Sequence, residues 1–195
     1  MTQDAAHNLT DEALVEAIVK TNDTLLFEVL YDRFAKMVYN KCYGFANSED
    51  EAEDLTQDVF LRVFVKLGSF KGRSKFSTWL YAFTYNHCVN YVTRNTAKKI
   101  EKQSVSSEII ENIGDAVDST HEFESMKVEQ LKRVMELIDP EEKMILLLKY
   151  QDNLSIKELS EALDIGESAV KMRLKRAKDK LVLKYNNFMK NGESV

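Results

Sequence analysis

The chain has 195 residues, 44% of them hydrophobic and 30% charged, with one proline, six glycines and a net charge of −5. This composition favours a compact, mostly helical protein, and the net charge argues against a DNA-binding protein that acts alone. No run of eighteen apolar residues occurs and the N-terminus lacks a signal-peptide pattern, so we expect a cytoplasmic protein without membrane insertion.

The first elements are three expected helices. Thr10 is a plausible N-cap for a helix over 11–20, and a longer helix is expected from about Asp23 to Gly44. The longer helix has an apolar stripe at i, i+4 spacing, formed by Leu26, Leu30, Phe34, Val38 and Cys42. Ser48 and Glu51 form a capping box for a third helix, which runs to about Leu67 and begins with six acidic residues and no basic one. An acidic first turn is by itself most often a solvated helix end.

A cationic and aromatic segment follows, from Phe70 to Arg94. Between Lys71 and Lys99 lie six basic residues and no acidic one, and aromatic residues alternate with them. Cations can follow a phosphate backbone, and rings can stack on unpaired bases for about 1–3 kcal/mol each, which suits single-stranded nucleic acid. Apolar residues at helical spacing predict a buried stripe on the same helix, made of Leu80, Phe83, Thr84, Cys88 and Tyr91. For Trp79 and Tyr81, packing and partner contact are both open.

Apolar periodicity ends near Asn95, and residues 101–124 hold seven acidic residues against one basic residue. This pattern predicts an acidic linker between two domains. Up to residue 124 the chain carries a charge of −7, and from residue 125 onward it carries +2. Contact with nucleic acid must therefore be local.

The second domain is expected to contain only helices. An amphipathic helix over 123–138 should bury Leu131, Val134, Leu137 and Ile138, and Asp139-Pro140 should start the next helix. Asn153 can take the left-handed conformation that ends this helix, and Ser155 and Glu158 form a second capping box. A short helix, a turn with Gly166 and a long basic helix then describe a helix-turn-helix.

The last helix holds six basic residues between Lys171 and Lys180, opposed only by Asp179. Its inward face is expected to be Ala169, Val170, Leu174, Ala177 and Leu181. The early turns of such a helix read base edges, which makes Lys171, Met172, Lys175 and Arg176 the expected readers. Arg173, Lys178 and Lys180 are expected to contact phosphate or partners within the helix.

Three motifs together resemble the extracytoplasmic-function (ECF) sigma factors of bacterial RNA polymerase. They are EAEDLTQDVFLRVF, FKGRSKFSTWLYAFTYN and DPEEKMILLLKYQDNLSIKELSEALDIGESAVKMRLKRAKDKL, in the order and spacing of the family. The resemblance implies an all-α fold of two small domains joined by a flexible linker. It implies region 2 over 1–96, the linker over 97–123 and region 4 over 124–195. Family members often have Ser, Thr and Ser where this chain has Gly166, Ala169 and Met172, which leaves the −35 sequence open.

The family resemblance also assigns surfaces. It implies docking on core RNA polymerase through Asp54, Leu55, Gln57, Asp58, Phe60 and Leu61. It implies −10 recognition and promoter melting through Lys71, Arg73, Lys75, Phe76, Trp79, Tyr85, Asn86, Asn90 and Arg94. The −35 element is expected to contact Lys171, Met172, Arg173, Lys175, Arg176 and Lys178. Promoter DNA and core RNA polymerase are the expected partners, and many members of the family also bind an anti-sigma factor.

Two other classes of protein compete with this interpretation. An autonomous helix-turn-helix regulator with an N-terminal sensor or dimerisation domain explains the second domain, but not the cationic and aromatic segment. An enzyme is disfavoured, because His7, His87 and His121 are far apart and no catalytic arrangement occurs. Cys42 and Cys88 match no metal spacing and are expected in the core, so we expect neither a metal nor a cofactor.

Overall fold

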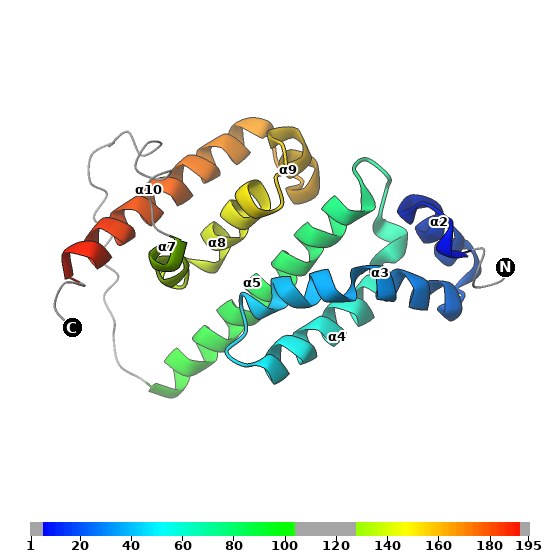
Figure 1. Ribbon diagram of the computed structural model, residues 1–195, viewed down its shortest axis with the longest axis horizontal. Helices are drawn as coiled ribbons and strands as arrows, with labels where there is room; N and C mark the ends of the chain where they lie inside the picture. Colours follow the sequence, from blue (N-terminus) through cyan, green and yellow to red (C-terminus); the bar gives the residue numbers. More distant parts are fainter. Residues whose placement is uncertain (1–5, 104–127, 192–195) are drawn as a thin grey trace. The chain divides into compact units, whose positions relative to one another are not determined.

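A computed structural model describes the backbone of residues 6–103 and 128–191, and the side chains of residues 6–97 and 130–190. These residues form helices and no strand, which confirms the predicted all-α fold (Figure 1). They group into two compact units, built mainly from α2–α5 and from α7–α10. None of the helices in these ranges has the length and apolar composition that a membrane span requires.

Among residues 11–103, the first unit contains the α-helices α2 to α5 and a short 3₁₀ turn. Their bounds are α2 Asp11–Thr21, α3 Thr24–Tyr43, α4 Glu49–Lys66, η1 Leu67–Ser69 and α5 Phe76–Gln103. The predicted caps explain where two of these helices begin. The hydroxyl of Thr10 accepts a hydrogen bond from the Ala13 N–H at 3.2 Å, and that of Ser48 accepts one from the Glu51 N–H, also at 3.2 Å.

The core of this unit is formed by the apolar stripes of α3, α4 and α5. The predicted stripe of α3 is buried along its whole length, and Leu80, Thr84 and Cys88 of α5 are fully buried. Cys42 and Cys88 meet in this core with their sulfur atoms 3.8 Å apart. Burying a side chain of the size of Leu or Phe contributes about 1.5–3 kcal/mol, so these stripes supply most of the stability of the unit.

The end of α5 differs from the prediction. The helix does not end near Asn95 but continues to Gln103, so the expected linker over 97–123 begins with helical residues. Its remainder, residues 104–123, lies outside the described residues. The domain boundaries at residues 96 and 124 remain predictions.

Two residues of the predicted stripe of α5 are only half-buried. Phe83 packs on the side of Trp79, where part of its ring meets solvent. Tyr91 keeps its hydroxyl at the edge of the core, where it donates a hydrogen bond to Oε1 of Glu51 at 2.6 Å. The stripe therefore buries its middle residues completely and its aromatic members in part.

Within residues 128–191, the second unit contains the α-helices α7 to α10 and one π-helical turn. Their bounds are α7 Val128–Met135, α8 Pro140–Leu146, η2 Leu147–Gln151, α9 Ile156–Leu163 and α10 Glu167–Asn191. Asn153 has a φ of 55°, which confirms its predicted left-handed conformation. The Ser155–Glu158 capping box is also confirmed, with the Ser155 N–H donating to Glu158 at 2.8 Å and the Glu158 N–H donating to Ser155 at 3.1 Å.

The helix-turn-helix is closed by one residue of α9. The Ser160 hydroxyl donates to the carbonyl of Ile165 at 2.5 Å, and the Ile165 N–H donates to the carbonyl of Ser160 at 3.1 Å. Asp164, rather than Gly166, takes the left-handed conformation in this turn, with a φ of 53°. The core stripe of α10 is as predicted for Val170, Leu174, Ala177 and Leu181, which are buried.

Two residues that were predicted to lie in the core of this unit are exposed instead. Leu137 was expected to face inward but is 55% exposed, because α7 ends at Met135 and the chain no longer follows the helical period there. Ala169 is exposed in the first turn of α10, where Val170 points into the core in its place.

Candidate polymerase and promoter interfaces

One face of α4 remains exposed after the core has formed. Four of the six residues expected to dock on polymerase lie on this face: Asp54, Gln57, Asp58 and Leu61. Leu61 is 68% exposed and Val65, one turn further on, is 77% exposed. Exposed apolar side chains next to carboxylates are typical of a surface that another protein covers.

Leu55 and Phe60, the other two expected docking residues, are buried. The expectation that they are freely available on the surface is therefore not met. Leu55 belongs to the core stripe of α4, whereas Phe60 packs against Tyr31 of α3 with ring centroids 4.5 Å apart. Phe60 thus contributes to the shape of the face from beneath.

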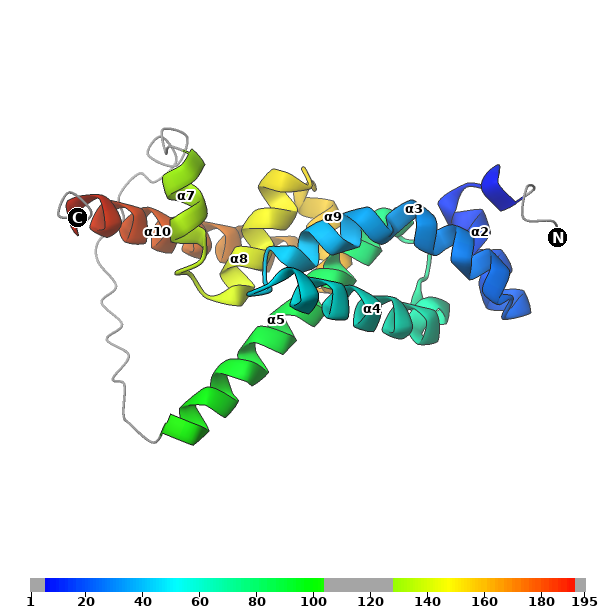
Figure 2. The same ribbon diagram turned by 60° about the horizontal axis from the view of Figure 1, so that its bottom comes forward.

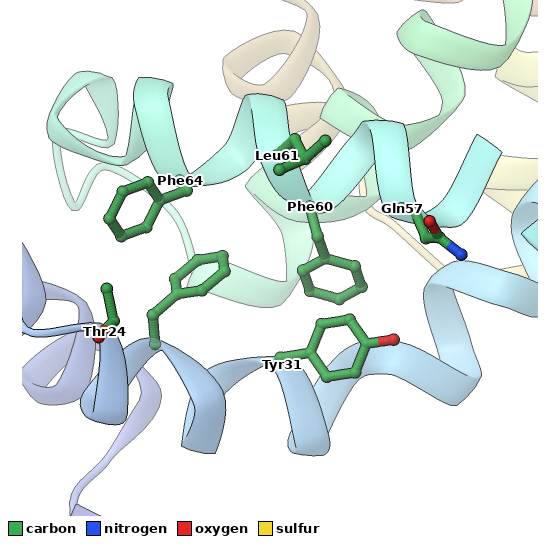
Figure 3. Close-up of a pocket in the computed structure, with 7 residues that line it drawn as sticks. Thr24, Tyr31, Gln57, Phe60, Leu61 and Phe64 are labelled. Atoms are coloured by element: carbon green, nitrogen blue, oxygen red, sulfur yellow. The ribbon is translucent and has the colours of Figure 1, made fainter. Parts of the chain in front are cut away.

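A groove of about 420 Å³ lies between α3 and α4, beside this exposed face (Figure 3). Its lining is almost entirely apolar and consists of Thr24, Phe27, Tyr31, Gln57, Phe60, Leu61 and Phe64. Figure 3 shows the aromatic side chains of the two helices facing one another across the groove. We define the exposed face of α4 and this groove together as the α3–α4 surface.

Asp58 of the α3–α4 surface also approaches α5. Its Oδ2 atom lies 3.8 Å from Nε2 of His87, whose side chain is largely buried. A change at Asp58 would therefore disturb α5 as well as the surface.

The loop before α5 presents its three cations to solvent. Lys71, Arg73 and Lys75 are all exposed. Gly72 between them has a φ of 64°, a left-handed conformation that residues with a side chain adopt only with strain. The tight turn at Gly72 therefore lets the three cations follow one another closely on the surface.

A cluster of aromatic rings lies directly beside these cations. Trp79 contacts Phe70, Phe76 and Phe83 with ring centroids between 5.1 and 5.8 Å apart. Phe70, Trp79 and Phe83 are half-buried, so part of each ring is accessible. Phe70 and Phe83 were not among the expected DNA-binding residues. Their spacing to Trp79, nine residues before and four after, was the available signal for both.

Two of the expected −10 residues are in the core instead. Phe76 and Tyr85 are 0% and 1% exposed, so the expectation that their rings can stack on bases is not met. Phe76 supports Trp79 from below, and Tyr85 packs against Phe45 and Lys41. The polar residues expected at this site, Asn86, Asn90 and Arg94, are all exposed on α5.

In the second unit the exposed face of α10 carries the expected −35 readers. Lys171, Met172, Arg173, Lys175 and Arg176 are exposed, opposite the buried stripe. Lys178 is half-buried, with its Nζ atom 5.1 Å from the centre of the Tyr150 ring. That cation–π contact occupies Lys178 within the protein.

Lys180 is bound to two carboxylates at the start of α8. Its Nζ atom lies 2.6 Å from Oε1 of Glu142 and 3.3 Å from Oδ2 of Asp139. The hydrogen bond to Glu142 raises the pKa of Lys180. Burial raises the pKa of Glu142, and this effect outweighs the attraction of Lys180. The structure therefore gives Lys180 partners within the protein but outside its own helix, where the sequence left phosphate and partners within the helix open.

Across residues 6–97 and 130–190, no three His, Cys, Asp or Glu side chains are arranged to hold a metal ion. The surfaces described above instead provide cations, amides and aromatic rings, which are the groups that bind nucleic acid.

Comparison with known families assigns both units to the sigma-70 proteins. Residues 30–98 match the family model of Sigma-70 region 2, and residues 128–181 match that of Sigma-70 region 4. The two matches together cover more than half of the chain. The chain thus has the two helical domains of a sigma factor, in the order that the sequence predicted.

Individual relatives identify the group within that family. The chain is 29% identical to the ECF RNA polymerase sigma factor SigW of Bacillus subtilis, over 84% of this chain and 90% of that protein. It is 27% identical to the ECF RNA polymerase sigma-E factor of Escherichia coli K12, over 89% and 93%. The chain belongs to the ECF sigma factors, which are specificity factors for transcription initiation and not enzymes.

Solved structures agree on the fold. CnrH, in complex with the cytosolic domain of CnrY, matches with a TM-score of 0.60 and 18% identity, over 91% of this chain and 97% of that one. RpoE of Bartonella quintana, in complex with the anti-sigma factor NepR, matches with a TM-score of 0.56 and 19% identity, over 81% and 96%. The family assignment confirms the sigma-factor prediction and disfavours the autonomous regulator.

Proposed function

We propose that this sigma factor binds polymerase and two promoter elements through three separate surfaces, all formed by described residues. The α3–α4 surface binds core RNA polymerase, the cationic loop with the aromatic cluster captures the melted −10 element, and the exposed face of α10 reads the −35 element. Because its partners are polymerase and chromosomal DNA, we place the protein in the cytoplasm. An anti-sigma factor, as bound by the structural relative RpoE of Bartonella quintana, is a further proposed partner.

The observation that carries the −10 assignment is the partly accessible ring cluster of Phe70, Trp79 and Phe83 beside three exposed cations. Rings that are packed against one another on one side keep a fixed orientation and still offer an edge or face to a base. Stacking on such rings contributes about 1–3 kcal/mol per base and is tolerant of sequence. Asn86 and Asn90 then add hydrogen bonds that distinguish one base from another.

The test is transcription by purified core polymerase with two sets of variants. Asp54→Arg with Gln57→Ala changes two exposed residues of the α3–α4 surface and avoids Asp58, which contacts His87. This variant should bind core polymerase at least about tenfold more weakly, because a repelling charge faces the partner. Replacing Lys71, Arg73 and Lys75 with Ala should leave core affinity unchanged and impair opening of a duplex promoter more than of a pre-melted one.

Permanganate reactivity of promoter thymines measures opening, and fluorescence anisotropy measures core affinity. Circular dichroism of both variants controls for the fold. If the loop variant loses activity equally on duplex and pre-melted templates, the loop contributes only general electrostatic attraction and the −10 assignment is wrong. Undiminished core affinity of the Asp54→Arg, Gln57→Ala variant would contradict the docking assignment.

A further inference from the structure

Helix α2 lies outside the segment that matches Sigma-70 region 2, which begins at residue 30. It nevertheless packs firmly on the first unit through Leu14, Val15 and Ile18, all of which are buried. Arg33 of α3 holds its start, with Nη1 2.7 Å from Oδ1 of Asp11 and Nη2 donating to two backbone carbonyls just before α2. In Figures 1 and 2, α2 lies beside the segment that joins α4 to α5.

One side chain of α2 reaches the beginning of α5. The Oε1 atom of Glu12 accepts a hydrogen bond from the backbone N–H of Phe76 at 2.9 Å, in a partly buried setting. Phe76 is the first residue of α5 and directly follows Lys75, the last cation of the loop. The first N–H groups of a helix have no partner within the helix, so Glu12 supplies one from 64 residues away in sequence.

The hydrogen bond from the Phe76 N–H to the Glu12 carboxylate is expected to be stronger than one between two neutral groups. An ionised acceptor makes a shorter and stronger hydrogen bond than a neutral one, and a negative charge is also favoured at the positive end of a helix. The bond fixes the point where the cationic loop enters the helix that carries Trp79. Val19 of α2 also lies near Gly68 at the other end of the same connection, 3.9 Å from where a Cβ atom would be.

We propose that Glu12 is a positioning residue for promoter opening. By capping α5 from α2, it holds the cationic loop and the aromatic cluster in the arrangement that captures an unpaired base. Helix α2 is then part of the melting apparatus, although its bond to Phe76 involves neither the cations of the loop nor the α3–α4 surface. The inference rests on the proposed function of the loop and goes further by assigning a residue that the loop depends on.

The alternative is that Glu12 only fastens α2 to the domain. A fastening role predicts a general loss of stability that affects core binding, duplex opening and pre-melted opening to the same extent. A positioning role predicts a selective loss on the duplex template. On that template the captured base must be held against re-pairing, so pre-arrangement of the loop matters most.

The experiment compares three variants of the full chain in complex with core polymerase. Glu12→Ala removes the cap, and Glu12→Gln keeps an acceptor oxygen without the charge. Glu16→Ala is the control, because Glu16 lies one turn further along the same helix and forms its ion pair with Lys20 of that helix. Opening is measured on a duplex promoter and on a pre-melted promoter, together with core affinity and the thermal midpoint of each variant.

Glu12→Ala should slow opening of the duplex promoter by about tenfold, the size expected for loss of a charge-assisted hydrogen bond. Opening of the pre-melted promoter and core affinity should change less than about twofold, within the range of a surface substitution. Glu12→Gln should lie between Glu12→Ala and the parent, and Glu16→Ala should match the parent. Because Glu12→Gln preserves the shape of the side chain, it tests the proposal even if Glu12→Ala does not fold.

Equal losses on both templates, or a parallel loss of core affinity, would overturn the positioning role. A Glu12→Gln or Glu12→Ala variant that opens the duplex at the parent rate would do the same. The Lys71, Arg73 and Lys75 variant, run in parallel, separates this failure from a failure of the loop assignment. If the loop variant is defective on duplex DNA while the Glu12 variants are normal, only the inference about Glu12 is wrong.

Discussion

At the scale of single residues, Lys180 shows that a basic residue of α10 can form its ion pairs within the protein instead of with DNA. Its Nζ atom lies between Glu142 and Asp139, at 2.6 and 3.3 Å. We predict that Lys180→Ala lowers the free energy of unfolding by about 1 kcal/mol, the upper range for a partly exposed ion pair. Affinity for the −35 duplex should change little, whereas Arg176→Ala should weaken it and flatten the base preference at one or two positions.

Thermal unfolding and duplex binding at several salt concentrations test this contrast. Arg173→Ala is the matched control, because Arg173 is exposed on the same helix and is expected to contact phosphate. It should weaken binding across sequences and reduce the salt slope by about one unit. If Lys180→Ala has the stability of the parent but loses DNA affinity, Lys180 contacts phosphate, which is one of the two roles expected from the sequence.

The pair of Lys180 and Glu142 gives the stability of the second unit a pH dependence of one sign in two pH ranges, because both pKa values are raised in the folded state. The pKa of Lys180 is raised in the folded state, so its contribution is complete below the ordinary pKa of a lysine and is lost as the pH rises through the raised value. The pKa of Glu142 is also raised, mainly by burial, so the folded state binds its proton more readily than the unfolded state does. The titration of Glu142 alone therefore favours folding as the pH falls through its raised pKa.

At the scale of elements, two glycines in turns before DNA-binding helices should respond oppositely to the same substitution. Gly166 precedes α10 and has no positive φ, and apart from its two chain neighbours no described residue has a heavy atom within 4 Å of the position that a Cβ atom would take. We expect Gly166→Ser to raise stability by about 0.5–1 kcal/mol, because it restricts the unfolded chain and adds an N-cap hydroxyl. Gly72 has a φ of 64°, so Gly72→Ser should lower stability by about 1 kcal/mol.

Chemical denaturation of the two variants tests this pair, and each serves as the control for the other. The −35 preference should also be compared with the parent for Gly166→Ser, since family members often carry Ser at this position. If both substitutions change stability in the same direction, the backbone conformations assigned to the two turns are wrong.

The elements also mark what the sequence could and could not predict. Apolar residues at helical spacing predicted the buried faces of α3 and α5, and local capping patterns predicted the starts at Ser48 and Ser155, because both depend on near neighbours in sequence. The contact of Phe60 with Tyr31 could not be predicted, since it joins residues of two different helices. The cap of α5 by Glu12 could not be predicted from local patterns either, because it joins residues 64 positions apart.

At the scale of the whole molecule, the uneven charge explains why the protein needs a partner. Residues 1–100 hold 12 basic and 13 acidic residues, a charge of −1, and the segment 101–124 carries −6, so the cationic loop belongs to a nearly neutral unit beside an acidic segment. From residue 125 onward the chain carries only +2, which supports weak binding to duplex DNA. Promoter affinity must therefore come largely from core polymerase, which places both units on one DNA at the same time.

This dependence leads to a prediction about the covalent connection between the units. Joining two binding modules in one chain raises apparent affinity by about 10²–10⁴ without any new contact, if both sites can be occupied together. A protease site placed within residues 104–127 allows the connection to be cut in the assembled protein. After cleavage, transcription from a promoter that requires its −35 element should fall at least about tenfold, since the second unit is no longer held near its site.

The units themselves should survive the cut, because each has its own buried core. Core binding by the cleaved protein and opening of a pre-melted −10 template should therefore stay near the parent level. Addition of the free second unit at high concentration should restore part of the lost transcription, as expected when the loss is one of effective concentration. A variant with a scrambled protease site of the same length controls for the insertion. If cleaved protein transcribes the −35-dependent promoter at the uncleaved rate, the connection is not what brings the second unit to its DNA.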